Sequence, residues 1–174
     1  MILGLDISTS IVGVCVLEDD KVVKTDYIDL RKVSGMLHKA QAVEDYINNN
    51  LKSEPIEHIF IEEALMFFRR GGSTAKTMSI LQRFNGIVSW LCFKEVGIDP
   101  QYISPISARS KCGIKVPRGK KAKEVVMEHF LDSGEFPIVY TRYGNVQKYC
   151  YDIADAVVVA KAGSKIILDT KKIV

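Results

Sequence analysis

The first part of the chain alternates between apolar runs and polar turns, a pattern typical of consecutive β-strands. Ile2–Asp6 is apolar up to its last residue, and Ile11–Leu17 is a second apolar run rich in β-branched residues. Asp19 and Asp20 then make a turn into a third run over Val22–Leu30. Three strands joined by short turns predict an antiparallel meander.

Two later segments carry apolar side chains at helical spacing. The first covers residues 34–52, and Ser34 is expected to cap its start because a serine side chain can accept a hydrogen bond from a free backbone N–H. The second covers residues 74–97 and is expected to end at Gly97, a residue typical of helix C-termini. Both segments predict amphipathic helices.

Short apolar runs between and after these helices predict the remaining elements. His58–Ile61 is expected to be a buried strand, and residues 100–104 predict one more short strand. Two further helices are predicted over Lys121–Leu131 and Asp152–Ala162.

The order of predicted elements is therefore three strands, helix, strand, helix, strand, helix, helix. Residues 66–74 and 109–120 are rich in glycine and basic residues, and we expect these loops to be the mobile parts. No internal repeat or low-complexity linker divides the chain. Residues 1–174 thus predict a single α/β domain with a mixed five-stranded sheet flanked by helices.

Length and composition exclude several classes of protein. A chain of 174 residues that is 47% hydrophobic can form one domain with its own core. Its longest apolar stretches, such as Ile87–Phe93, are far shorter than the ~20 residues of a membrane-spanning helix. The N-terminus has an acidic Asp6 within its apolar stretch and no basic start, so a secretory signal is not expected. We therefore expect a protein with no membrane partner that stays where it is made.

The four cysteines are scattered singly along the chain. Cys15, Cys92, Cys112 and Cys150 form no C-x-x-C pair and have no nearby histidines that would complete a zinc site. The expectation is reduced thiols, with disulfides as the less favoured alternative.

Charge is unevenly distributed even though the net charge is only +3. No acidic residue occurs from Ala64 to Lys94 or from Pro100 to Lys123, and both stretches are basic. Acidic residues gather elsewhere, so one face could attract a polyanion such as nucleic acid. The alternative is an ordinary solvated surface rich in lysine.

Acidic residues also occur where an apolar core would not favour them. Asp6 ends the first apolar run, and Glu62 and Glu63 directly follow the apolar run His58–Ile61. Asp152 and Asp155 lie at i and i+3, on one face of a helix that is otherwise mostly apolar. Taken singly, Asp152 could be an acid favoured by the start of its helix, and Glu62 could be an exposed strand end.

Taken together, these acids suit a metal site better than either structural role. Like charges on one helix face repel, and a bound cation removes that repulsion. Mg²⁺ prefers oxygen ligands, and two such ions ~3.5–4 Å apart can drive phosphodiester hydrolysis.

Three segments carry a resemblance to a known family. GLDISTSIVGVCVL (residues 4–17), IFIEEALMFF (59–68) and YDIADAVVVAKAG (151–163) resemble, in order and spacing, the signature segments of the RuvC family of Holliday-junction resolvases. The resemblance implies an RNase H-like fold, a homodimer, and cleavage of four-way or other branched DNA with Mg²⁺ or Mn²⁺, two ions per active site.

The family pattern implies roles for particular residues. The catalytic and metal-binding acids would be Asp6, Glu62, Asp152 and Asp155, with Glu63 as the fallback for Glu62. The residues that would contact DNA are Phe67, Phe68, Arg69, Arg70, Lys111, Lys115, Arg118, Lys120, Lys121 and Lys123. The alternative for Phe67 and Phe68 is a place in the core.

Two segments depart from the bacterial pattern. Residues 132–150 match nothing familiar from the bacterial enzymes, and GLDIST replaces the more usual Gly-x-Asp-Pro-Gly. These departures predict a diverged member encoded by a virus or phage. We expect it to act in a bacterial cytoplasm, or in an infected host cell if it is viral. The sequence preference of cleavage stays open.

Other functions compete with a resolvase. Ser8, Thr9 and Ser10 resemble the phosphate loop of actin-like ATPases and sugar kinases, but those proteins need two such domains. A YqgF-like nuclease acting on RNA would keep the fold and change the substrate. A non-catalytic nucleic-acid-binding protein would keep the fold and lose the acids. If the protein is a dimer, the helix over 74–97, with Phe84, Trp90 and Phe93 on more than one face, is the expected interface.

Overall fold

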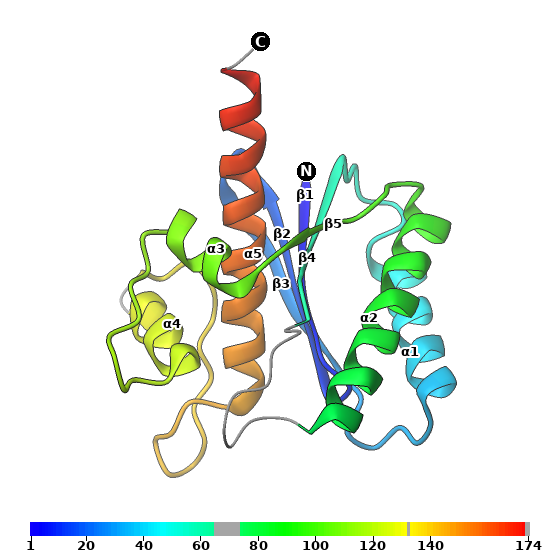
Figure 1. The fold of residues 1–174 in the computed structure, drawn as a ribbon, viewed down its shortest axis with the longest axis horizontal. Coiled ribbons are helices and arrows are strands. Elements are labelled where there is room, and N and C mark those ends of the chain that lie inside the picture. Colours follow the sequence, from blue (N-terminus) through cyan, green and yellow to red (C-terminus); the bar gives the residue numbers. More distant parts are fainter. Residues whose placement is uncertain (65–73, 132, 173–174) are drawn as a thin grey trace.

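The centre of the protein is a mixed five-stranded sheet. The computed structural model describes residues 1–64, 74–131 and 133–172. The strands lie in the order β3-β2-β1-β4-β5 (Figure 1). The antiparallel meander consists of β1 (Ile2–Ile7), β2 (Ile11–Glu18) and β3 (Lys21–Asp29). Parallel pairing then adds β4 (His58–Glu62) beside β1 and β5 (Gln101–Ile103) beside β4.

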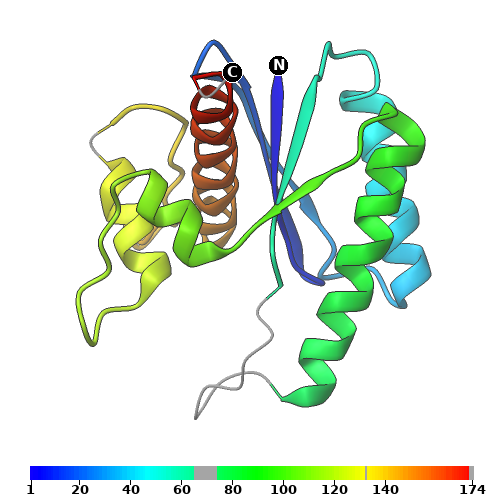
Figure 2. The same cartoon turned by 45° about the horizontal axis from the view of Figure 1, so that its top comes forward.

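Helices cover both faces of this sheet (Figure 1 and Figure 2). On one face lie α1 (Met36–Asn50) and α2 (Ala75–Val96). On the other lie α3 (Pro105–Lys111), α4 (Ala122–Leu131) and α5 (Lys148–Lys171). The predicted α/β class with a mixed five-stranded sheet is therefore confirmed.

Strand alternation divides the core into two layers. Leu3, Leu5 and Ile7 of β1 lie in the cluster that also contains the buried side chains of α1 and α2. The residues between them face α5, because successive side chains of a strand point to opposite faces. Asp6 therefore lies on the α5 side of the sheet.

Helix α5 packs directly on the strands because glycines face it. A methyl group built on Gly13 of β2 would lie 2.1 Å from the carbonyl oxygen of Asp152, and one on Gly163 of α5 would lie 2.2 Å from the ring of Phe60. Both distances are far below van der Waals contact. The backbones of helix and sheet thus approach more closely than any larger residue would allow.

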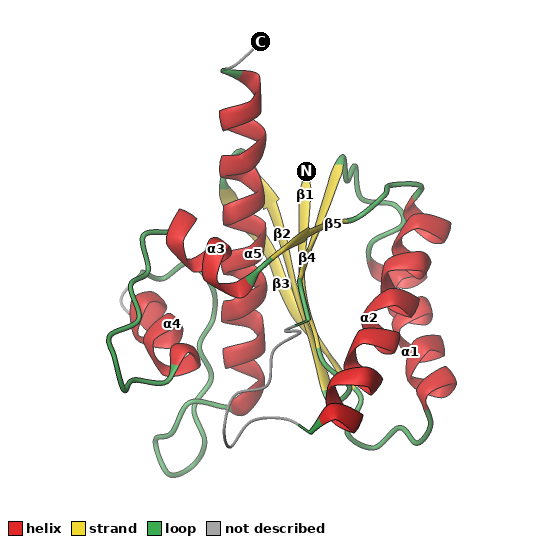
Figure 3. Cartoon of the chain, in the orientation of Figure 1, coloured by secondary structure: helices red, strands yellow, loops and turns green. Residues whose placement is uncertain are grey.

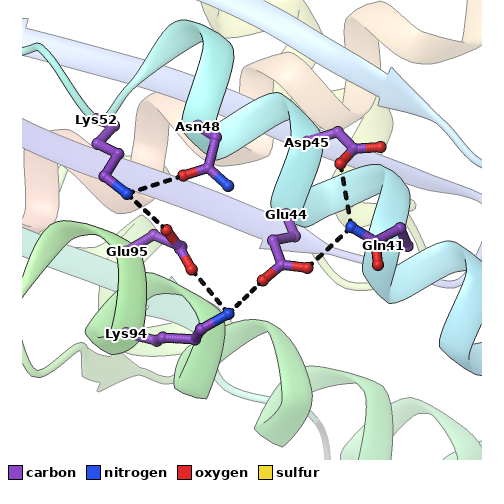
Figure 4. A network of polar contacts seen from close by, with 7 residues as sticks. All are labelled: Gln41, Glu44, Asp45, Asn48, Lys52, Lys94 and Glu95. Atoms are coloured by element: carbon purple, nitrogen blue, oxygen red, sulfur yellow. Dashed lines mark hydrogen bonds and ion pairs between the residues drawn. The ribbon is translucent and has the colours of Figure 1, made fainter.

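Helices α1 and α2 are joined by a polar network. Lys94 of α2 contacts Glu44 of α1 at 2.5 Å and Glu95 at 2.9 Å, and Lys52 contacts Glu95 at 2.9 Å. Figure 4 shows this interhelical network, which consists of Gln41, Glu44, Asp45, Asn48, Lys52, Lys94 and Glu95.

Some predicted boundaries are wrong. Ser34 does not cap α1, because the cap position is Gly35 at φ 86°, and the Ser34 carbonyl oxygen lies 3.0 Å from Nδ1 of His38. The helix predicted over Asp152–Ala162 is longer at both ends. Helix α3 was not predicted and takes up residues 109–111 of the predicted loop. Gly97 is confirmed as the C-cap of α2, with φ 81°.

All four cysteines are free thiols, as expected. Within residues 1–64, 74–131 and 133–172, no helix is long and apolar enough to cross a bilayer.

Candidate active site

Two strands deliver acids to the same edge of the sheet. Parallel pairing of β1 with β4 aligns Gly4 with Phe60, so Asp6 and Glu62 follow two residues later on each strand. Phe60 contacts Gly163 of α5, and alternation places Glu62 on that same face. Asp6 and Glu62 therefore lie side by side beneath α5.

Helix α5 delivers the other two acids. Asp152 and Asp155 lie near its N-terminal end, and three-residue spacing places both on one side of the helix. Close packing on Gly13 holds the backbone of Asp152 against β2. The four side chains, here called the carboxylate cluster, are Asp6, Glu62, Asp152 and Asp155.

Lys123 of α4 extends its ammonium group into the carboxylate cluster. Its Nζ lies 2.7 Å from Asp152, 3.4 Å from Asp155 and 3.8 Å from Asp6. The acid side chains are mostly buried, with exposed fractions of 8–14%, whereas that of Lys123 is 56% exposed. One lysine on a neighbouring helix thus contacts acids from two separate elements.

Burial and mutual repulsion disfavour ionisation of the cluster. Burial, followed by the charges of Glu62 and Asp155, raises the pKa of Asp6 well above its usual range. Burial and then Asp155 raise the pKa of Glu62 to about 7. Burial also raises the pKa of Asp155, although Lys123 offsets part of the effect. Negative charge is therefore crowded in this cluster beyond what one lysine neutralises.

Two basic side chains stabilise the ionised acids. Burial alone would lower the pKa of Lys123, but Asp6, Asp155 and Asp152 raise it above its usual range. The charge of Arg109, on α3, lowers the pKa values of Glu62 and Asp155 against the larger effect of burial. Positive charge close to the carboxylate cluster is therefore strongly favourable.

The chemistry of this donor set fits a hard divalent cation. All four side chains of the cluster are carboxylates, which Mg²⁺ and Mn²⁺ prefer over nitrogen or sulfur. In the described part of the chain, no three His, Cys, Asp or Glu side chains already stand at metal-binding separations. Instead, the ammonium group of Lys123 lies among the acids.

The structure also places Glu63, the alternative to Glu62. Glu63 is exposed, and its backbone N–H donates to the carbonyl oxygen of Ile103. Glu62 is half-buried and the charge of Asp155 helps to raise its pKa, so its surroundings favour Glu62 as the member of the cluster.

The residues predicted to contact DNA do not all lie near the carboxylate cluster. Lys115, Arg118, Lys120 and Lys121 are exposed in and beside the segment between α3 and α4. Lys111 instead contacts Asp169 at 3.3 Å, and Asp169 lies roughly 25 Å along α5 from Asp152 at the usual helical rise. Phe67, Phe68, Arg69 and Arg70 lie outside the described residues.

Arg109 is a candidate that the sequence analysis did not select. Besides acting on the carboxylate cluster, it lines a surface hollow of about 550 Å³ together with Lys115 and Lys120. The signal available in the sequence was Ser104-Pro105, a capping residue followed by a proline, which predicts a helix start and so a defined position for Arg109.

The serine-rich turn after β1 has a structural role. Ser8 Oγ donates to the carbonyl oxygen of Ile11 at 2.7 Å and accepts from the backbone N–H groups of Ser10 and Ile11. These contacts hold the β1–β2 turn, so Ser8 is already engaged where a phosphate loop would need its hydroxyl free.

Comparison with known proteins shows what shares this fold. No family model matches the chain, and no curated protein matches its sequence. Among solved structures, RuvC of Thermus thermophilus in complex with a Holliday junction substrate matches with a TM-score of 0.65 and 15% identity, over 94% of this chain and 91% of that one.

Two further structures are similar. A second Thermus thermophilus RuvC structure matches with a TM-score of 0.64 and 16% identity, over 97% of this chain and 96% of that one. The yeast mitochondrial Holliday junction resolvase matches with a TM-score of 0.59 and 15% identity, over 92% and 76%. The predicted RNase H-like fold of the RuvC type is thereby confirmed.

Proposed function

We propose that this chain is a metal-dependent endonuclease that resolves Holliday junctions by paired symmetrical nicks. The observation that carries the proposal is the meeting of Asp6, Glu62, Asp152 and Asp155, which come from β1, β4 and α5, around one ammonium group. The RuvC structure solved with a junction substrate supports the choice of DNA.

The four acids would hold Mg²⁺ or Mn²⁺, as two ions in the active enzyme. When bound, these ions supply an activated water and neutralise charge on the leaving oxygen. The acids themselves fix the position of this chemistry, because Asp6 and Glu62 lie on a rigid sheet and the other two on a helix packed against it.

Lys123 has two roles in this proposal. Without metal, its ammonium neutralises part of the carboxylate cluster. With metal and DNA, its side chain, which is 56% exposed, would turn to a backbone phosphate. Arg109 would hold a neighbouring phosphate from α3.

Exposed basic residues between α3 and α4 would bind the DNA backbone on either side of the scissile phosphate. Lys115, Arg118, Lys120 and Lys121 are the candidates in the described part of the chain. Such contacts position DNA without reading its sequence. Phe67, Phe68, Arg69 and Arg70 remain proposed contacts at the junction centre.

We further propose a homodimer through α2. Trp90 and Phe93 lie one turn apart on this helix and are 57% and 54% exposed, whereas Phe84 is fully buried in the core. Two copies joined here would supply the two active sites that paired nicks require. Trp90→Glu should convert a dimer to a monomer in sedimentation analysis.

The experiment that tests the function compares four substrates. Labelled four-way junction, replication fork, linear duplex and structured RNA are incubated with protein in Mg²⁺ or Mn²⁺, and the products are mapped. Symmetrical nicks on the junction alone are expected. Preferential cleavage of RNA would instead indicate a YqgF-like activity, and binding without cleavage would indicate a non-catalytic protein.

A further inference from the structure

The segment before α5 forms a small hairpin. Tyr140 and Val146 make an isolated antiparallel bridge, and the backbone N–H of Thr141 donates to the carbonyl oxygen of Asn145 at 2.7 Å. Residues 138–147 are here called the α5 hairpin. Figure 3 shows them as a loop that projects beyond the N-terminal end of α5. The hydrogen bonds give this loop a defined shape.

The base of the α5 hairpin is fixed to the helix that carries two of the acids. The backbone N–H of Val139 lies 3.5 Å from Sγ of Cys150, a buried residue in the first turn of α5. Next to it, the ring of Tyr149 stacks on Tyr27 of β3 at 4.0 Å. Asp152 follows Cys150 by two residues. The hairpin is therefore held close to the carboxylate cluster.

The tip of the hairpin presents aromatic rings and positive charge to solvent. Tyr143 is 74% exposed and Tyr140 is 53% exposed. The guanidinium of Arg142 lies 4.6 Å from the centre of the Tyr143 ring. Residues 138–151 contain Arg142 and Lys148 but no acid, and they hold four of the seven tyrosines of the protein.

This combination matches one kind of partner. Stacking on aromatic rings and attraction of phosphate by basic side chains are the two means by which proteins bind unpaired nucleotides. A protein partner would be expected to meet apolar surface with charges of both signs, whereas the charged residues of 138–151 are both basic. A branch point in DNA offers an unpaired or easily unstacked base beside a phosphate.

We propose that the α5 hairpin stacks Tyr140 and Tyr143 on a base at the branch point of the DNA, with Arg142 on the adjacent phosphate. This inference rests on the proposed function, since it assigns the hairpin to the same substrate. It adds a recognition element for branched DNA.

The test measures binding and stacking separately from cleavage. A four-way junction with 2-aminopurine at the branch point is titrated with protein in EDTA, which excludes cleavage. Relative to wild type, the double variant Tyr140→Ala/Tyr143→Ala should lose about tenfold to a hundredfold in junction affinity and should no longer quench the probe. Its affinity for linear duplex should change by less than about twofold, because linear duplex offers no unstacked base.

Matched variants test whether junction binding needs the aromatic rings of Tyr140 and Tyr143. Tyr140→Phe/Tyr143→Phe keeps both rings and should bind the junction like wild type. Tyr143→Leu keeps apolar bulk at an exposed position, loses the ring, and should behave like the alanine variant. Because it changes only one exposed side chain, it also serves if the double alanine variant melts at a lower temperature than wild type.

The outcomes distinguish the two levels of the proposal. If wild type binds the junction but the alanine and leucine variants bind it equally well and still quench, the hairpin inference is overturned and the nuclease proposal stands. An equal loss on linear duplex would also overturn the inference, because the hairpin would then serve general binding. If wild type binds no branched DNA at all, both proposals fall.

Discussion

Two acid-rich regions of this protein have opposite electrostatic character. In the interhelical network of α1 and α2, hydrogen bonds from Lys52 and Lys94 lower the pKa of Glu95 to about 2 (Figure 4). In the carboxylate cluster, burial and neighbouring acids raise the pKa of Glu62 to about 7. Both regions mix acids with lysines, yet one favours ionised carboxylates and the other disfavours them.

The balance of charge explains the difference. Three acids and two lysines share the interhelical network, and each lysine contacts an acid at 2.5–2.9 Å. Four acids share the cluster with one lysine, Lys123, whose contacts range from 2.7 to 3.8 Å. A satisfied network stabilises the fold, whereas an unsatisfied buried one indicates a site for a further cation.

The largest difference between the carboxylate cluster and the interhelical network is expected in catalysis. Asp6→Asn removes a proposed metal ligand and should lower junction cleavage at least about a hundredfold, while junction affinity in EDTA stays within about twofold of wild type. Asp45→Asn, in the interhelical network, is the control and should cleave normally. The rate of junction cleavage is measured under single-turnover conditions. Near-normal cleavage by Asp6→Asn would show that Asp6 is not a metal ligand.

Metal should stabilise one region and leave the other unaffected. At Mn²⁺ concentrations about 100 times the dissociation constant, the wild-type melting temperature should rise by about 5–10 °C. Lys123→Met should melt several degrees below wild type without metal, because buried acids lose their counter-ion, and should gain more from Mn²⁺. Lys94→Met should show the same Mn²⁺ gain as wild type. If Lys123→Met melts at the wild-type temperature in EDTA, Lys123 does not neutralise the buried acids and this prediction is wrong.

The pH dependence of stability should have opposite signs in the two regions. Because the pKa of folded Glu62 is raised from 4.5 to about 7, the metal-free protein should lose stability as pH rises through that range. Glu95 has a lowered pKa, so its contribution is present above 4.5 and is lost as pH falls toward about 2. Melting in EDTA from pH 3 to 8 should show both slopes. Glu62→Gln should reduce only the first slope, which Asp6 and Asp155 share. Glu95→Gln should reduce only the second, to which Asp29 also contributes.

The smallest effect is expected for a substitution that removes a buried charge. Asp155→Asn should melt at the wild-type temperature or slightly above it in EDTA, because the pKa of Asp155 is raised chiefly by burial. Its gain from Mn²⁺ should be smaller than that of wild type. Lower stability in EDTA with an unchanged gain would make Asp155 a structural residue, and leave Asp6, Glu62 and Asp152 as the metal ligands.

Local patterns in the sequence predicted much of the fold and grouped the four acids. The apolar run of β1 ends in Asp6 and that of β4 ends in Glu62, so the sequence placed each acid at the end of a buried strand. Asp152 and Asp155 lie on one side of a helix by their spacing alone. The proximity of the three segments was implied by family resemblance.

The position of Lys123 could not be read from the sequence. It contacts Asp152, which is 29 residues away, through the packing of α4 against α5. Local pattern carries no information on such a contact, so Lys123 was grouped with the phosphate-binding lysines. The length of α5 was missed for a related reason, because Gly163 suggests a helix end but serves to fit the helix against Phe60.

The contact between Gly13 and α5 has a consequence for the tolerance of the protein to mutation. A methyl group at Gly13 would meet the carbonyl oxygen of Asp152 at 2.1 Å, and backbone on both sides leaves no flexible side chain to yield. Gly13→Ala would therefore move the helix that carries two acids away from the strand that carries Asp6. A random-mutagenesis screen for inactive enzyme should recover this position beside the acids themselves, although Gly13 has no side chain with which to touch metal or DNA.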